Sequence, residues 1–126
     1  MLADGYFLLG DYDRARQTAE EAVELADRHG AKYILGWAVR LLGEIAMKTI
    51  PDESAHYFEK AISISQEIKA ENELALAYSG MGRYYKHQGD RTHAKEYLSK
   101  ALEIFEKLGT LIEPDKVRKE LAELPQ

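Results

Sequence analysis

Four histidines are the side chains in this sequence best suited to bind a metal ion or transfer a proton: His29, His56, His87 and His93. None lies in the His-Glu-x-x-His pattern of a zinc site, and the absence of cysteine removes thiolate catalysis and Cys-based metal sites. Gly80-x-Gly82 falls inside a helical pattern, so it is not a phosphate-binding loop. No serine has a histidine and a carboxylate at a recognisable triad spacing. We therefore predict a protein that is not an enzyme, with no catalytic residue, metal or cofactor.

A stripe of polar and aromatic side chains remains after the apolar faces of the predicted helices are assigned to the core. Its members recur every three or four residues, which places them on one helix face. They are Tyr33, Trp37, Arg40, Glu44 and Lys48 on one helix and Asn72, Leu76, Ser79, Arg83 and His87 on the next. Because Trp, Tyr and Arg dominate binding hot spots, the stripe predicts a groove that binds a partner. The alternative is that Trp37 packs between helices and the arginines pair with Glu44 or nearby acids.

Composition limits the class of protein. The 126 residues are 45% apolar, which is typical of a folded domain, and 22 acidic against 17 basic residues give a net charge of −5. This charge, without a local Lys/Arg cluster, argues against nucleic-acid binding. No apolar run approaches the roughly 18 residues that would span a membrane, and the first residues lack a signal-peptide pattern. We expect a cytoplasmic protein that contacts neither membrane nor nucleic acid.

Helix-breaking residues divide the chain into helical segments. Gly10-Asp11 and Gly89-Asp90 each end one helix and cap the next, and Gly30 ends another. Helices are predicted over 12–29, 31–48 and 53–69, with Asp52 capping the third after the break at Pro51. The boundary at 69–72 has neither glycine nor proline. No stretch alternates with a period of two, so no strand is predicted.

The apolar positions predict which faces are buried. Helix 31–48 buries Ile34, Ala38, Leu41, Leu42, Ile45 and Ala46, and helix 53–69 buries Ala55, Phe58, Ala61, Ile62 and Ile68. Near the C-terminus, Glu113-Pro114-Asp115 starts a helix with Val117, Leu121 and Leu124 inward and with Lys116, Arg118, Lys119, Glu120 and Glu123 toward water. Gly82 lies in mid-helix, which predicts a close crossing with another helix.

The hairpins repeat. Their second helices carry Ala22, Ala61 and Ala101 at intervals of 39 and 40 residues. The third repeat, with Tyr78-x-x-Met81-Gly82-x-x-Tyr85 followed by Ala94, Leu98 and Ala101, resembles the tetratricopeptide repeat (TPR). Its length is similar to the long repeats of kinesin light chains and of C-terminal TPR arrays in bacterial regulators.

The resemblance implies an all-α fold of antiparallel helical hairpins, stacked as a right-handed TPR solenoid with a C-terminal capping helix. Residues 1–109 would form about two and a half to three hairpins, the first truncated, and residues 110–126 would form the capping helix and tail. The implied function is a non-enzymatic scaffold that binds a protein or peptide in the concave groove. The alternative is a regulatory or assembly segment of a larger bacterial signalling protein, such as a transcription activator or nucleotide cyclase.

Two further expectations concern partners. One TPR subtype clamps a C-terminal carboxylate with Lys and Asn, but Glu44 and Asp4 stand where Asn is expected, so that specificity does not carry over. The truncated first hairpin would leave Ala19, Val23, Tyr6 and Phe7 uncovered, and we expect a homodimer through residues 2–26 that buries them.

Overall fold

A computed structural model describes residues 2–109 and 112–125, with side chains for 2–109 and 114–125. These residues form α-helices and one 3₁₀ turn, Pro51–Glu53, and contain no strand, so the predicted all-α class is confirmed. The predicted tail starts at Thr110, which lies outside the described residues. The helices are α1 (Leu2–Leu8), α2 (Tyr12–His29), α3 (Lys32–Thr49), α4 (Ser54–Glu67), α5 (Glu71–His87), α6 (Arg91–Leu108) and α7 (Ile112–Ala122).

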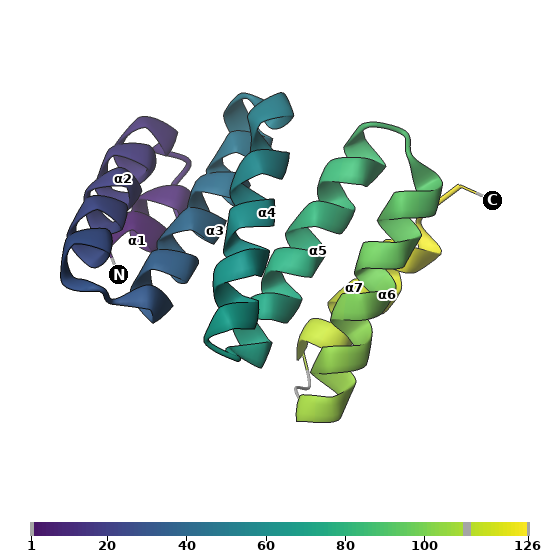
Figure 1. The fold of residues 1–126 in the computed structure, drawn as a ribbon. Helices are drawn as coiled ribbons and strands as arrows, with labels where there is room; N and C mark the ends of the chain where they lie inside the picture. The colour runs from purple at the N-terminus through teal and green to yellow at the C-terminus, as the bar shows by residue number, and fades with distance from the viewer. Residues whose placement is uncertain (1, 110–111, 126) are drawn as a thin grey trace.

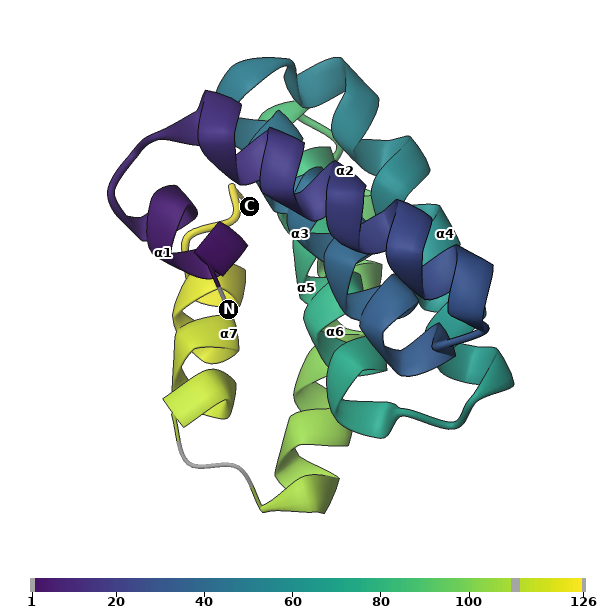
Figure 2. The same cartoon turned by 90° about the vertical axis from the view of Figure 1, so that its left-hand side faces the viewer.

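Each helix packs against the next one in the chain, and α3 also packs directly against α5. Figure 1 shows the helices side by side along one array, from α1 and α2 at one end to α6 and α7 at the other. In Figure 2, α1 and α7 lie on one side of α3 and α5, and α2 and α4 lie on the other. The odd-numbered helices therefore share one face of the array, which we call the inner face.

Four helix ends share one backbone geometry, although only three of them use glycine. A residue with a positive φ lies one or two positions after each of these helices: 80° at Gly10, 67° at Gly30, 57° at Lys69 and 77° at Gly89. Gly109 after α6 also has a positive φ, of 72°, and the residue that follows it lies outside the described ones. At the other four ends the hydrogen bonding is the same. The following residue donates its backbone N–H to the carbonyl five positions earlier, as Ala70 does to Ser65 at 2.9 Å. The helix end at Lys69 therefore has the same geometry as the ends at glycine, although it lacks the glycine that usually marks such an end in a sequence.

The predicted caps are confirmed at two of three helix starts. Asp11 and Asp90 accept hydrogen bonds from the backbone N–H groups of Arg14 and His93, at 3.3 and 3.1 Å. The prediction for Asp52 is wrong, because the 3₁₀ turn intervenes and moves the start of α4 to Ser54. The Asp52 carboxylate instead accepts a hydrogen bond from Gln88 at 3.2 Å.

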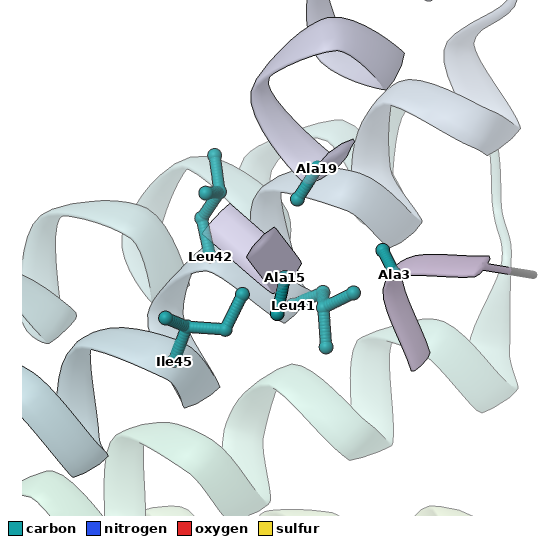
Figure 3. Close-up of a cluster of buried hydrophobic side chains, with 6 residues drawn as sticks. All are labelled: Ala3, Ala15, Ala19, Leu41, Leu42 and Ile45. Atoms are coloured by element: carbon teal, nitrogen blue, oxygen red, sulfur yellow. The ribbon is translucent and has the colours of Figure 1, made fainter. Parts of the chain in front are cut away.

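The first three helices enclose an apolar cluster, shown in Figure 3. It contains Ala3, Ala15, Ala19, Leu41, Leu42 and Ile45, with Tyr6, Phe7 and Val23 packed around it. The predicted uncovered patch is therefore wrong for Ala19, which is fully buried because α1 and α3 both reach it. The large apolar side chains that remain exposed on α1 and in the turn after it are Leu2, Leu8 and Leu9, and Leu25 of α2 is exposed as well. Ile34, predicted to be buried, is 43% exposed because it lies beyond this cluster on the first turn of α3.

Phe58 of α4 fills the space between α3 and α5. Its ring is completely buried and lies against two glycines, one from each neighbouring helix. A Cβ atom at Gly43 would come within 2.8 Å of the ring, and one at Gly80 within 2.3 Å. Since carbon atoms do not approach so closely, only glycine fits at either position.

The third hairpin and α7 form a second cluster. A Cβ atom at Gly82 would lie 2.6 Å from Leu98, which supports the close crossing predicted there. Val117 is buried against α6, and Leu121 and Leu124 pack beside it, as predicted. Glu120 departs from its predicted exposure to water. Its side chain is only 13% exposed because it turns toward Arg83 of α5.

We expect Gly80→Ala to lower the free energy of unfolding by about 1–3 kcal/mol, because the added methyl group overpacks the Phe58 ring. Gly5→Ala is the matched control, since no described atom lies within 4 Å of its added Cβ and it occupies a helix. That change should be neutral or stabilising by up to about 1 kcal/mol. Urea unfolding followed by circular dichroism measures both, and equal midpoints would contradict the role given to Phe58.

Candidate functional site

Two members of the predicted groove lie in the interior. Arg40 is 9% exposed and Ser79 is 3% exposed, so neither offers its side chain to a partner. Leu76 is half-buried against the cluster around Leu98, and Trp37 is half-buried against the cluster of the first three helices. The remaining residues of the stripe are partly or largely exposed: Tyr33, Glu44, Lys48, Asn72, Arg83 and His87.

The interior arginine belongs to a chain of ion pairs across the inner face. Arg40 of α3 contacts Glu73 of α5 (Nε to Oε2, 2.8 Å) and Glu44 on its own helix (Nη1 to Oε2, 3.2 Å). Glu44 also contacts Arg83 of α5 (Oε1 to Nη2, 3.1 Å), and Arg83 Nη1 lies 3.7 Å from Oε1 of Glu120 on α7. Acids and bases alternate along this chain, so each charge faces an opposite one. The alternative to a partner groove that the sequence left open, in which the arginines pair with Glu44 and nearby acids, agrees with these contacts.

The charges in this series of ion pairs are not equally compensated. Burial disfavours the charged form of Arg40, but Glu44, Glu73 and Asp4 outweigh it and raise the pKa of the guanidinium above its ordinary value. Both carboxylate oxygens of Glu120 are hidden from solvent and accept no hydrogen bond from the described residues. Glu120 is therefore held by the charge of Arg83 rather than by direct hydrogen bonds.

Two adjoining cavities open on the inner face beside these ion pairs. One, of about 370 Å³, is bordered by all four odd-numbered helices, through Phe7, Glu44, Met47, Lys48, Arg83 and Lys116. The other, of about 610 Å³, lies between α5 and α7 and is bordered by Arg83, Lys86, His87, Lys116, Lys119, Glu120 and Glu123. Arg83 and Lys116 border both, so we treat the two cavities as one surface, the basic groove.

Sequence reasoning missed seven of the eleven residues that border this surface. Lys116 and Lys119 were assigned to the solvated side of a capping helix, and Lys86 was left out of the stripe. The structure places α7 beside α5, where it forms a wall of the groove. Lys86 and Glu123 pair across this wall at 3.0 Å, and the pairing lowers the pKa of Glu123. An apolar stripe on a terminal helix shows which side is buried, but not what its polar side faces.

Other classes of site find no support in the described residues. Within 2–109 and 114–125, no three His, Asp or Glu side chains come together as a metal site. Over the same described part of the chain, no helix is both long enough and apolar enough to cross a membrane. The four histidines do not converge.

Comparison with known proteins identifies the repeats. Residues 1–29 and 51–107 each match a family described as Tetratricopeptide repeat. The chain belongs to the tetratricopeptide repeat family. TPR arrays are generally non-catalytic and act as protein–protein interaction scaffolds, so this chain is a repeat scaffold for binding other proteins.

A solved structure extends the likeness to nearly the whole TPR chain. BtubC (BKLC) from P. vanneervenii matches 98% of this chain at 25% sequence identity, with a TM-score of 0.84. The match covers 51% of BtubC, so this chain spans about half the length of that protein. No curated protein sequence matches the chain. The predicted all-α solenoid is confirmed.

The contribution of the buried ion pair between Arg40 and Glu73 to stability can be tested. Arg40→Met should lower the free energy of unfolding by about 3–5 kcal/mol, because it leaves Glu73 buried without its partner. Arg28→Met is the control: it removes an exposed pair with Glu24 and should cost no more than about 0.5 kcal/mol. Urea unfolding compares the two variants with the parent.

A double variant separates the charge effect from lost packing. Arg40→Met combined with Glu73→Leu should recover more than half of the stability that Arg40→Met loses, because no buried charge is then left alone. If Arg40→Met is as stable as Arg28→Met, or if Glu73→Leu restores nothing, the contact between α3 and α5 does not depend on this ion pair.

Proposed function

We propose that the basic groove binds an acidic, extended segment of a partner protein. The observation that carries the proposal is a concentration of cations on one surface of a chain whose net charge is −5. The groove is bordered by Lys48, Arg83, Lys86, Lys116 and Lys119, against the carboxylates Glu44, Glu120 and Glu123. An excess of positive charge in a concave surface attracts carboxylates and speeds their association.

The cations differ in how strongly they are already engaged. Arg83 is held by two glutamates and Lys86 pairs with Glu123. Lys116 and Lys119 are exposed side chains on α7, at the open side of the groove. We infer that these two lysines make the first contacts with an acidic partner, and that Arg83 and Lys86 hold the groove walls together.

The remaining lining favours a peptide over a nucleic acid. Glu44 and Glu123 can accept hydrogen bonds from peptide N–H groups, and together with Glu120 they repel a row of phosphates. Phe7 and Met47 add an apolar border to the smaller cavity, which suits an aromatic or aliphatic side chain. The expected ligand therefore carries carboxylates on both sides of an apolar residue.

The direct test uses a fluorescein-labelled peptide of alternating glutamate and leucine, and the same peptide with glutamine in place of glutamate. Fluorescence anisotropy should show that the acidic peptide binds more tightly and that added salt weakens it. Lys116→Glu combined with Lys119→Glu should weaken that binding by about tenfold, because attraction becomes repulsion.

The matched control is Lys60→Glu combined with Lys95→Glu. It changes the net charge by the same amount at exposed positions on α4 and α6, away from the groove. Equal weakening by both double variants would show that overall charge, not the groove, decides binding. Equal binding of the glutamate and glutamine peptides would contradict the acidic specificity, and tighter binding of an RNA oligonucleotide would assign the groove to nucleic acid.

We further propose that the exposed N-terminal leucines mediate self-association. Leu2, Leu8 and Leu9 are 64%, 82% and 84% exposed, an apolar surface that one two-fold contact would cover on both copies. The predicted contact region, residues 2–26, is kept, but these leucines take the place of the buried Ala19 within it. The other prediction, a regulatory or assembly segment of a larger signalling protein, stays a prediction.

Sedimentation at several protein concentrations should show a dimer whose population rises with concentration. Leu8→Gln combined with Leu9→Gln should shift it to monomer, because the paired apolar surface is lost. Leu108→Gln, a 43% exposed leucine at the opposite end of the array, is the control and should leave the dimer unchanged. A monomer at all concentrations, or a dimer that persists in the Leu8/Leu9 variant, would overturn the proposal.

A further inference from the structure

A third cavity on the chain differs in chemistry from the basic groove. It measures about 240 Å³ and is lined by Asp4 of α1 and by Tyr33, Ile34 and Trp37 of α3. The groove lies at the C-terminal ends of α3 and α5, whereas this cavity lies at the first two turns of α3. Its described lining thus consists of two aromatic side chains, one carboxylate and Ile34. We call it the aromatic cavity.

The two aromatic side chains are placed to act together. Tyr33 and Trp37 are one helical turn apart, so their side chains project from the same face of α3. Trp37 is anchored on one side by the cluster of Leu41 and Ile45, whereas Tyr33 is 59% exposed. The cavity thus has one fixed aromatic wall and one accessible aromatic wall.

Asp4 is the only charged residue in the described lining of the cavity. Asp4 acts electrostatically on Arg40, whose guanidinium also faces Glu44 and Glu73. Three carboxylates, those of Asp4, Glu44 and Glu73, thus act on the Arg40 guanidinium. A cation entering the cavity would therefore meet a favourable field, and an anion would be repelled.

The faces of Trp and Tyr rings attract cations, most strongly when the cation is weakly hydrated. The lining provides one carboxylate but few hydrogen-bond acceptors for the three N–H groups of an unmodified lysine. A quaternary ammonium group needs none, because methyl groups cover its charge. We propose that the aromatic cavity binds a quaternary ammonium group, carried either by a trimethylated lysine of a partner or by a small ligand such as choline.

Trp37 is the only tryptophan in the chain, so its fluorescence reports directly on the cavity. The probes are choline, its uncharged isostere 3,3-dimethylbutanol, and a short peptide with trimethyllysine beside the same peptide with unmodified lysine. Choline and the trimethylated peptide should change the emission saturably, and the isostere and the unmodified peptide should bind more weakly. The tighter of the two binders identifies the source of the ammonium group.

Variants test the two parts of the lining. Tyr33→Leu should weaken choline binding by roughly twofold to thirtyfold, the range that one cation–π contact supplies. Asp4→Asn should also weaken it, whereas Asp13→Asn, the same charge change at an exposed position of α2, should not. Circular dichroism verifies that each variant is folded.

Three results would overturn the proposal. They are an emission unchanged by both choline and the trimethylated peptide, an equal response to choline and its uncharged isostere, and an equal effect of Asp4→Asn and Asp13→Asn. None of these measurements uses the acidic peptide or the basic groove, so failure here leaves the proposed function standing, and failure of that function leaves this inference standing.

Discussion

The contact of Phe58 with two glycines fixes how closely α3 and α5 approach each other. The ring fills the space that a side chain at Gly43 or Gly80 would occupy, and it has no exposed surface. Because the two helices are this close, a side chain on one can reach the other along the inner face. The 2.8 Å contact between Arg40 and Glu73 and the 3.1 Å contact between Glu44 and Arg83 both depend on that distance.

The inner face is therefore charged, and its arginines are held in ion pairs with glutamates. Alternating acids and bases join α3, α5 and α7, and different side chains line the two ends of the face. Lysines gather where α5 and α7 border the basic groove. Aromatic side chains and Asp4 border the aromatic cavity at the start of α3. A TPR scaffold with such a face is suited to partners whose charges are arranged along the segment that binds, negative at one end and positive at the other.

Local signals in the sequence predicted most of the fold, because turns and apolar spacing depend on neighbouring residues. Gly-Asp pairs located two helix starts, and the recurring alanines set the repeat. Lys69 shows where such signals fail, since it adopts the left-handed conformation that glycine usually provides. The site was harder to predict. Burial of Arg40 requires Glu73 from another helix, and the role of Lys116 and Lys119 depends on where α7 packs, neither of which the spacing along one helix contains.

The most direct test of this account is to map an acidic peptide on the ¹⁵N-labelled chain by chemical-shift perturbation. The account predicts that the largest shifts follow the inner face, at the amides around Lys48, Arg83, Lys86 and Lys116, and that the exposed side of α2, α4 and α6 stays unchanged. Shifts centred on those even-numbered helices, with the amides of the basic groove unaffected, would contradict it.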